Sequence, residues 1–382
     1  MKPIYLDYMA TTPLDPLVKK SMLDALGEVE GGLFGNANSL HYYGRKAKEV
    51  IKNARTKVAN LVNCPPQSIL WTSGATESNN LAIKGAADFY RRQGNHIITS
   101  AIEHSSVLAC CKQLETQGFE VSYVQPSSDG LVEPHTLEKE IRRETVLISL
   151  MHANNEIGTI QDINKIGKIA KDRGILLHVD AAQTLGKIPI DLAQLSVDLM
   201  SFSAHKIYGP KGIGALYIRS NPRLHLTPQM HGGLQESSLR AGTLATHQIV
   251  GMGEACYIAG QRMQEESRYQ QYLLNLLIEA TANWDNITIN GSLKHRLPNN
   301  LNLSIGGVDH KLLVDALEDI AISSIAACHD TQPSHVLKAI GVEGRLIDNS
   351  LRISIGRFTT EEEIRYAIDY LNLIINQLRG KK

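Results

Sequence analysis

The sequence predicts an α/β fold, with a mainly parallel central sheet in a large domain and a smaller α+β domain after it. Short apolar runs of strand length alternate with longer amphipathic stretches of helical period, which is the pattern of strands joined by helices. The chain has 382 residues, of which 43% are hydrophobic, enough for two domains. We expect a large domain over residues 15–258 and a small domain over residues 259–382, which the N-terminal segment 1–14 completes.

Strands and helices alternate through the first half of the chain. A strand over Ser68–Ser73 precedes a helix over Thr76–Arg92, which Gly94 ends. Because helical segments separate the apolar runs, we expect the strands to pair in parallel. Four further runs predict strands: His96–Ser100, Val121–Val124, Thr145–Met151 and Leu176–Asp180.

The second half begins with a long amphipathic pattern. It runs from Gln248 to about Ala282 and predicts a helix that joins the two domains. A new region opens at Ile287, and a strand over Leu317–Ser323 follows. A further helix begins at Pro333 and ends at Gly341, so the residues between this strand and helix form a loop.

The charge balance excludes several classes of partner. Lys plus Arg and Asp plus Glu both number 39, so the net charge gives no bulk attraction to nucleic acid or to an anionic membrane. No stretch is apolar enough to span a bilayer, and Met1–Ala10 contains Asp7 and no apolar core of a signal peptide. We expect a cytoplasmic protein without direct nucleic-acid or membrane partners.

The five cysteines have no metal-binding spacing and are odd in number, which is typical of free thiols in a reducing compartment. We therefore expect no metal site. Cys110, Cys111 and Cys256 lie in helical, Ala- and Leu-rich contexts, which favours a role as small buried side chains. Cys328 lies in the predicted loop and does not share that context.

Two polar residues stand where apolar runs end. Asp180 closes the run Ile175–Val179, and ligands of open α/β sheets bind at the carboxyl ends of strands. Lys206 lies in the loop after the next apolar segment, within Phe202-Ser203-Ala204-His205-Lys206. A lysine that forms an imine and a carboxylate that keeps a ring nitrogen protonated are what pyridoxal phosphate (PLP) needs. The sequence therefore predicts a PLP enzyme.

Lys206 must lose its charge to act as a nucleophile, so its pKa has to lie below the usual value of about 10.4. We expect burial and the nearby positive charge of His205 and Lys211 to lower it. A lone lysine would indicate only a solvated surface. The combination with Asp180 and Gln183 is what favours catalysis.

The turn Thr72–Glu77 offers a second group of contacts for the cofactor. Gly74 permits close backbone approach, and the following helix presents free amides to a phosphate. By itself such a turn is equally well explained by helix capping. We expect Ser203 and His205 to close the same phosphate site from the other side.

Five longer motifs, spread over nearly the whole chain, resemble the cysteine desulfurases of the NifS/IscS group. This resemblance implies a homodimer of the PLP-dependent transferase fold type I. It also implies an enzyme that takes sulfur from L-cysteine, leaves L-alanine and passes a persulfide sulfur to an acceptor protein. The motifs are Leu6–Pro13, Ser73–Gly85, Met151–Gly158, Asp198–Leu216 and Gly356–Glu363.

The resemblance implies roles for individual residues. Lys206 would bind the cofactor covalently, Asp180 would pair with the ring nitrogen, and His104 would stack on the ring and move protons. Arg352 and Asn155 would bind the substrate. Taken alone, His104 is as well explained as a capping residue and Arg352 as a surface residue. The remaining cofactor contacts would come from Ala75, Thr76, Asn155, Gln183, Ser203, His205 and Thr243 of the partner subunit.

The sulfur-accepting thiol would be Cys328, with His329 beside it to favour the thiolate. The family sequence before this cysteine is Ser-Ser-Gly-Ser-Ala, whereas this chain has Ser323-Ser324-Ile325-Ala326-Ala327. A stiff β-branched side chain thus replaces a flexible glycine. This departure bears on turnover rate and partner choice, and it leaves a specialised desulfurase for DNA phosphorothioation open.

Two other readings remain at this point. A PLP aminotransferase or lyase acting on another amino acid would use Lys206, Asp180 and Arg352 but would not need Cys328. A PLP-binding scaffold with little turnover would serve a sulfur-transfer complex. The acceptor of the sulfur also stays open between iron–sulfur cluster assembly, tRNA thiolation and DNA phosphorothioation.

Overall fold

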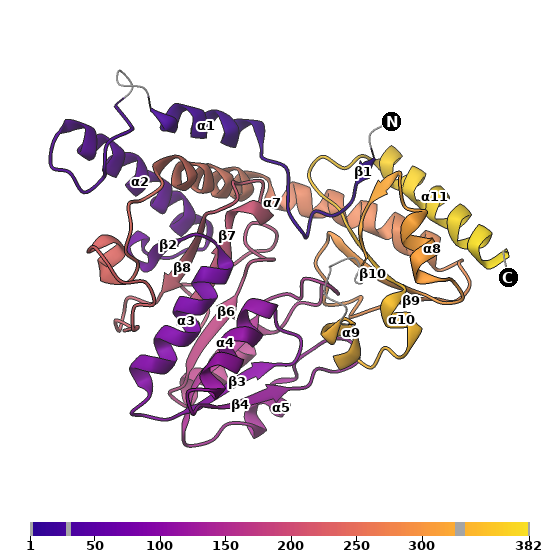
Figure 1. The fold of residues 1–382 in the computed structure, drawn as a ribbon, viewed down its shortest axis with the longest axis horizontal. Helices are drawn as coiled ribbons and strands as arrows, with labels where there is room; N and C mark the ends of the chain where they lie inside the picture. Colours follow the sequence, from indigo (N-terminus) through magenta and orange to yellow (C-terminus); the bar gives the residue numbers. More distant parts are fainter. Residues whose placement is uncertain (1–2, 28–31, 325–332, 381–382) are drawn as a thin grey trace.

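The computed structural model describes residues 3–27, 32–324 and 333–380. Its main part is a seven-stranded sheet in the order β2-β8-β7-β6-β5-β3-β4, with helices on both faces (Figure 1). The strands β7, β6, β5, β3 and β4 pair in parallel, and β8 runs antiparallel to both β7 and β2. The bounds are β2 Ile69–Thr72, β3 His96–Ser100, β4 Glu120–Val124, β5 Thr145–Met151, β6 Leu176–Asp180, β7 Leu199–Ser203 and β8 Gly214–Ile218.

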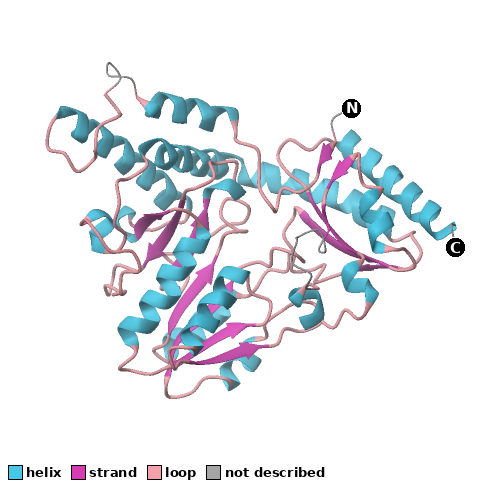
Figure 2. Ribbon diagram, in the orientation of Figure 1, coloured by secondary structure: helices cyan, strands magenta, loops and turns pink. Residues whose placement is uncertain are grey.

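Helices cover this sheet in two layers, each with its own apolar core (Figure 2). On one face Leu81 and Leu114 pack with Leu147 of β5. On the other face Ile166 and Met252 pack in the same core as Ile148. The helices of this part are α1 Pro16–Leu26, α2 Tyr42–Leu61, α3 Ala75–Tyr90, α4 Ser105–Glu115, α5 Pro134–Lys139 and α6 Ile163–Asp172, with 3-10 turns η1 Pro66–Ser68, η2 Ala204–Lys206 and η3 Gln235–Ser238.

The C-terminal part is built on a four-stranded antiparallel sheet in the order β12-β13-β10-β9. Beside it β1 of the N-terminal segment pairs in parallel with β11, so the beginning of the chain joins its end. The elements are β1 Ile4–Tyr5, β9 Ile287–Ile289, β10 Asn300–Ile305, α8 His310–Asp315, β11 Ile320–Ala321, β12 Ser323–Ser324, α9 His335–Ala339, α10 Arg345–Asp348, β13 Ser350–Ser354 and α11 Glu361–Gly380.

Helix α7 (Thr246–Thr281) is 36 residues long and runs from one part to the other (Figure 1). Its first half supplies Met252 and Cys256 to the core under the large sheet. Its second half supplies Leu273 and Leu277 to the C-terminal core, which Leu6 also enters. We propose that residues 15–258 form one domain and that residues 259–382 with the segment 1–14 form the other, since the apolar cores divide in this way.

The predicted α/β class with a mainly parallel central sheet is confirmed. The strands over residues 96–100, 145–151 and 176–180 have the predicted bounds, and the long helix differs from its prediction by only one or two residues at each end. One prediction was wrong, because Leu317–Ser323 is not a single strand. The chain changes partner at Ile322, so that β11 pairs with β1 while β12 pairs with β13.

Three of the cysteines are buried in helices, as expected. Cys110 and Cys111 lie in α4 and Cys256 in α7. Burial raises the pKa of Cys110 to about 11 and that of Cys256 to about 12, so both thiols are inert at neutral pH.

In the part of the chain that the structure describes, none of the helices combines the length and the hydropathy that a bilayer span requires.

Candidate active site

A cavity of about 740 Å³ lies at the carboxyl ends of the parallel strands, where the C-terminal sheet closes over the large sheet. The loops after β2, β3, β5, β6 and β7 all open into it. The cavity therefore gathers residues that are widely separated in the sequence. Among its lining residues are Ala75, Thr76, His104, Asn155, Asp180, Gln183, Ser203, His205, Lys206 and Arg352.

Lys206 lies on the turn η2, directly after β7. Its amine donates hydrogen bonds to the carbonyls of Met9, at 2.5 Å, and Ala10, at 2.7 Å. Burial, and secondly the charge of Arg352, lower the pKa of Lys206 to about 8. About a tenth of this amine is therefore uncharged at pH 7, far more than for an ordinary lysine, and the uncharged form is what a nucleophile or base requires.

The source of this lowered pKa differs from the sequence-based expectation. The positive charge that acts on Lys206 is that of Arg352, and not that of His205 or Lys211. Burial in fact lowers the pKa of His205 itself to about 4, so its imidazole is neutral. A neutral imidazole cannot supply the charge that its position in the sequence suggested.

Asp180 ends β6 and is only 6% exposed. One carboxylate oxygen accepts from the amide nitrogen of Asn79 at 2.8 Å, and the other accepts from the backbone of Ala182 at 3.0 Å. No cation pairs with Asp180 among the residues that the structure describes. Its charge is thus held by neutral donors and stays available to a cationic group in the cavity.

The amide of Asn79 links Asp180 to His104. It also donates to Ser106 Oγ at 2.8 Å, and Ser106 Oγ lies 2.8 Å from His104 Nδ1. Because the backbone N–H of Ser106 also donates to Nδ1, this nitrogen is an acceptor, and Nε2 carries the proton of the neutral ring. Desolvation lowers the pKa of His104, against the opposite effect of Asp180.

The end of the cavity beside α3 has the features of a phosphate cradle. The N-cap residue of this helix is Gly74, which has no side chain to cap the helix N-terminus. The backbone amides of the first turn therefore face the cavity without a capping partner. Ser203 and His205 lie across from it, and His205 Nδ1 is 3.1 Å from Thr11 Oγ1. Hydroxyl and ring donors therefore surround a helix terminus that attracts anions.

Arg352 projects from β13 and is the cation of the opposite wall. Its guanidinium donates to Asp7 Oδ1 and to Ser323 Oγ, both at 2.7 Å, and to the carbonyl of Asn155 at 2.9 Å. Its buried Nε has no hydrogen-bond partner. The side chain is held in place and retains capacity to bind a carboxylate.

Known proteins with similar sequences show the family to which this chain belongs. The family model for class-V aminotransferases matches residues 4–366. A cysteine desulfurase IscS of Pseudomonas aeruginosa (strain UCBPP-PA14) is 53% identical over 380 residues, which cover 99% of this chain and 94% of the relative. The chain belongs to this family, as a cysteine desulfurase.

Solved structures agree with the sequence comparison. A NifS-like protein superposes with a TM-score of 0.91 at 38% identity and covers 98% of this chain and 100% of its own. SspA in complex with cysteine gives a TM-score of 0.81 at 37% identity, over 94% of this chain and 100% of its own. The desulfurase accordingly has the fold type I architecture and is PLP-dependent.

The residues of the cavity fit this cofactor. It offers a partly neutral amine, a carboxylate bound only by neutral donors, and an uncapped helix terminus, which match the aldehyde, the ring nitrogen and the phosphate. One predicted site residue that the structure describes, Thr243, does not line the cavity of its own chain, since it is expected from the partner subunit. Cys328 lies outside the described residues.

Several residues of the desulfurase site were not predicted from the sequence. Asp7 and Ser323 hold Arg352, while Asn79 and Ser106 connect Asp180 with His104. Asp7 stands in a conspicuous N-terminal motif, so the motif itself was a signal for it. Asn79 likewise lies within the motif Ser73–Gly85. Ser106 carries no such signal, because hydroxyls at helix starts are common for capping alone.

Proposed function

We propose that this desulfurase removes sulfur from L-cysteine and leaves L-alanine, with the sulfur received as a persulfide on Cys328. The observation that carries the proposal is the placement of Lys206, with its lowered pKa, and Asp180 in one cavity with Arg352. A structural relative was solved in complex with cysteine, which supports cysteine as the substrate. In the balanced reaction, L-cysteine and the enzyme thiol give L-alanine and the enzyme persulfide.

The large-domain residues would hold PLP and move protons. When bound, PLP supplies an aldehyde that condenses with amines and a ring that withdraws electrons from the substrate α-carbon. We propose that Lys206 takes the α-proton, that Asp180 holds the proton of the ring nitrogen, and that His104 covers the ring and carries protons at Nε2. The phosphate contacts would be Ala75, Thr76, Ser203 and His205, with Thr243 of the partner subunit; Gln183 and Asn155 would contact the ring and its hydroxyl.

Arg352 would bind the substrate carboxylate, with Asn155 beside it. A guanidinium pairs with a carboxylate through parallel hydrogen bonds, which fixes the orientation of the amino acid. In the structure Asp7 already occupies one edge of Arg352. A substrate carboxylate would therefore share Arg352 with Asp7.

The described residues on either side of Cys328 support its proposed role. Ser323 and Ser324 line the cavity before it, and after it Ser334 Oγ donates to Glu156 at 2.6 Å, another lining residue. Position 328 follows Ser324 by four residues, a length of chain that spans at most about 14 Å. This length of chain is compatible with the proposed attack of the Cys328 thiol on a substrate in the cavity.

Membership in the family supports a proposal for the oligomeric state, the cellular location and the partner protein. We propose a homodimer in the cytoplasm, in which each subunit lends Thr243 to its neighbour, and a sulfur-acceptor protein as the second partner. The 53% identity to a cysteine desulfurase named IscS favours an acceptor in iron–sulfur cluster assembly over tRNA thiolation or DNA phosphorothioation.

The proposal is tested by product analysis. Pure holoenzyme is incubated with L-cysteine and a reductant, and sulfide and alanine are measured for the wild type, Cys328→Ser and the control Cys64→Ser. We expect equal amounts of sulfide and alanine from the wild type and the control, and a loss of about 100-fold or more in Cys328→Ser, because no other nucleophile receives the sulfur.

Other outcomes identify the alternatives. A keto-acid product, or full turnover by Cys328→Ser, would indicate an aminotransferase or lyase that does not use the thiol. A yellow protein without either product would indicate a scaffold. The match to cysteine desulfurases disfavours both.

A further inference from the structure

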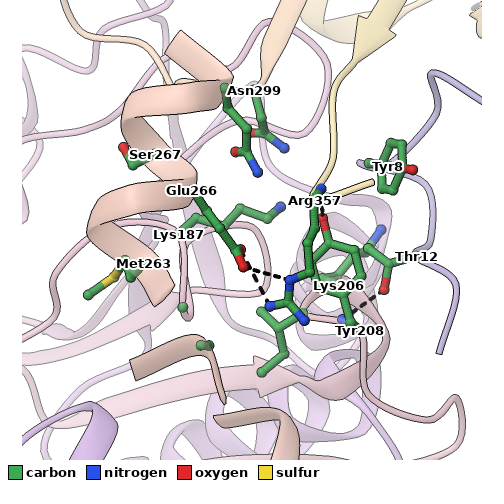
Figure 3. Close-up of a pocket in the computed structure, with 14 residues that line it drawn as sticks. Tyr8, Thr12, Lys187, Lys206, Tyr208, Met263, Glu266, Ser267, Asn299 and Arg357 are labelled. Atoms are coloured by element: carbon green, nitrogen blue, oxygen red, sulfur yellow. Dashed lines mark hydrogen bonds and ion pairs between the residues drawn. The ribbon is translucent and has the colours of Figure 1, made fainter. Parts of the chain in front are cut away.

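A second lysine lies behind the catalytic one. Lys187 lines a small cavity of about 20 Å³ that also includes Lys206, Glu266 and Arg357 (Figure 3). Figure 3 shows its side chain extended among the residues that line this cavity, and Lys187 is half-buried. The roles proposed above give this buried amine no task, although burying a lysine costs stability unless it is used.

Among the residues with described positions, Lys187 forms no ion pair with a carboxylate. Glu266 is engaged by Arg357, with Nε to Oε1 at 2.6 Å, and Arg357 is also paired with Asp15. The remaining charges that act on Lys187 are the cations Lys206 and Arg352. Burial first, and then these two cations, lower the pKa of Lys187 to about 7.

The amine of Lys187 donates its hydrogen bond to Gln183 Oε1, at 3.2 Å. The other end of the same amide, Gln183 Nε2, donates to the carbonyl of Met9 at 3.1 Å. A carbonyl accepts only, so the nitrogen of the amide must face Met9, and the oxygen is left to face Lys187. The two contacts therefore fix the same orientation of the Gln183 amide.

The carbonyl of Met9 also accepts from Lys206. A continuous chain thus runs from Lys187 through the amide of Gln183 and the Met9 carbonyl to the catalytic amine. Gln183 lines the main cavity as well, and Nε2 has a second N–H that the Met9 bond does not use. An amide turned by 180° would present its oxygen at this place instead.

We propose that Lys187 is a positioning residue that holds the amide of Gln183 with its N–H donors toward the main cavity and the Met9 carbonyl. An uncharged amine still donates hydrogen bonds, so the contact persists on both sides of its pKa. Without Lys187 the amide keeps only the Met9 contact, so one of the two contacts that fix its orientation is lost. A donor that faces the anionic ring oxygen of the cofactor would then be lost part of the time.

The test uses the visible absorption of the holoenzyme as a function of pH, which does not depend on turnover. We expect Lys187→Met to move the midpoint of this titration upward by about one pH unit, because the lost donor stabilised the deprotonated oxygen. Gln183→Leu should move it at least as far, because it removes the donor altogether. Gln270→Leu is the control, because Gln270 lines the same small cavity and makes neither contact.

A double-mutant cycle separates positioning from direct charge effects. If Lys187 acts through Gln183, the Lys187→Met change adds nothing in the Gln183→Leu background. Two shifts that add fully would overturn the proposal, because Lys187 would then act through space. An unchanged midpoint in Lys187→Met would overturn it as well.

A second substitution at the same position distinguishes loss of the hydrogen-bond donor from a folding defect. Lys187→Leu is apolar and smaller, so it tests the same loss of the donor without overpacking the site. If neither variant binds cofactor while Gln183→Leu does, Lys187 serves folding and the proposal fails. The inference rests on PLP binding in the main cavity: a colourless wild-type protein would refute the proposed function itself, whereas an unshifted coloured variant refutes only the role of Lys187.

Discussion

The two walls of the active-site cavity are built differently. On the large-domain wall, hydrogen bonds through the side chains of Asn79 and Ser106 connect Asp180 with His104. All four residues belong to the large sheet or to the loops and helices that follow its strands. On the opposite wall, Arg352 from the C-terminal sheet is held by Asp7 of the N-terminal segment. The first wall is formed within the large sheet and its helices. The second wall forms only where segments that are far apart in the sequence come together at Arg352.

This difference assigns different tasks to the two walls. Side chains that are linked to one another by hydrogen bonds keep their geometry without a ligand, which suits the binding and activation of a cofactor that stays. A cation that shares its bonds with Asp7 and Ser323 can adjust when a substrate enters and leaves. We therefore expect substitutions on the first wall to affect chemistry and those on the second to affect substrate binding.

The largest effect is expected at Lys206. Lys206→Ala removes the amine that we propose as both the cofactor-binding group and the base, so turnover should fall by about 1,000-fold or more. The control Lys19→Ala, on the exposed side of α1, should match the wild type. Alanine production from L-cysteine measures this, and a variant that keeps a tenth of the activity would show that another group takes the α-proton.

A smaller and different effect is expected at Arg352. Arg352→Leu should lower kcat/KM by about 100-fold, mainly through KM, because the bidentate carboxylate contact is lost. Since Arg352 also lowers the pKa of Lys206, the pH profile should shift to higher pH. Arg365→Leu, which breaks an exposed ion pair with Glu361, is the matched control. A loss confined to kcat would place Arg352 with the chemistry and break the division between the walls.

The smallest expected effect is on the free energy of unfolding, and it tests whether burial keeps Glu103 of the first wall protonated. Glu103 is fully buried below His104, and burial raises its pKa to about 8. Between about pH 4.5 and 8 the folded state keeps a proton that the unfolded state has lost, so Glu103 makes the protein less stable as the pH rises. In Glu103→Gln, a neutral amide replaces the protonated acid. Urea unfolding should show this variant gaining about 1–2 kcal/mol over the wild type from pH 5.5 to 7.5, and no relative gain would mean that Glu103 is ionised.

The sequence allowed the first wall to be predicted better than the second. Lys206 and Asp180 end or follow apolar strands, so their position at one edge of the sheet follows from strand order alone. The Arg352–Asp7 contact joins residues 345 positions apart, and the Lys206–Met9 contact spans 197 positions. Local patterns carry no information on such pairs, and burial of the whole site then decides which charge acts on Lys206.

The pairing of the N-terminal segment with the last third of the chain has a consequence for biosynthesis. Ile4 pairs with Ile320, Ser354 donates to the carbonyl of Leu6, and Lys206 binds the carbonyls of Met9 and Ala10. Strand β1 thus receives its partner β11 only after the 316 residues that lead from Ile4 to Ile320 have been translated. The large sheet can form earlier in synthesis than the contacts that bring Asp7 and Met9 to the cavity.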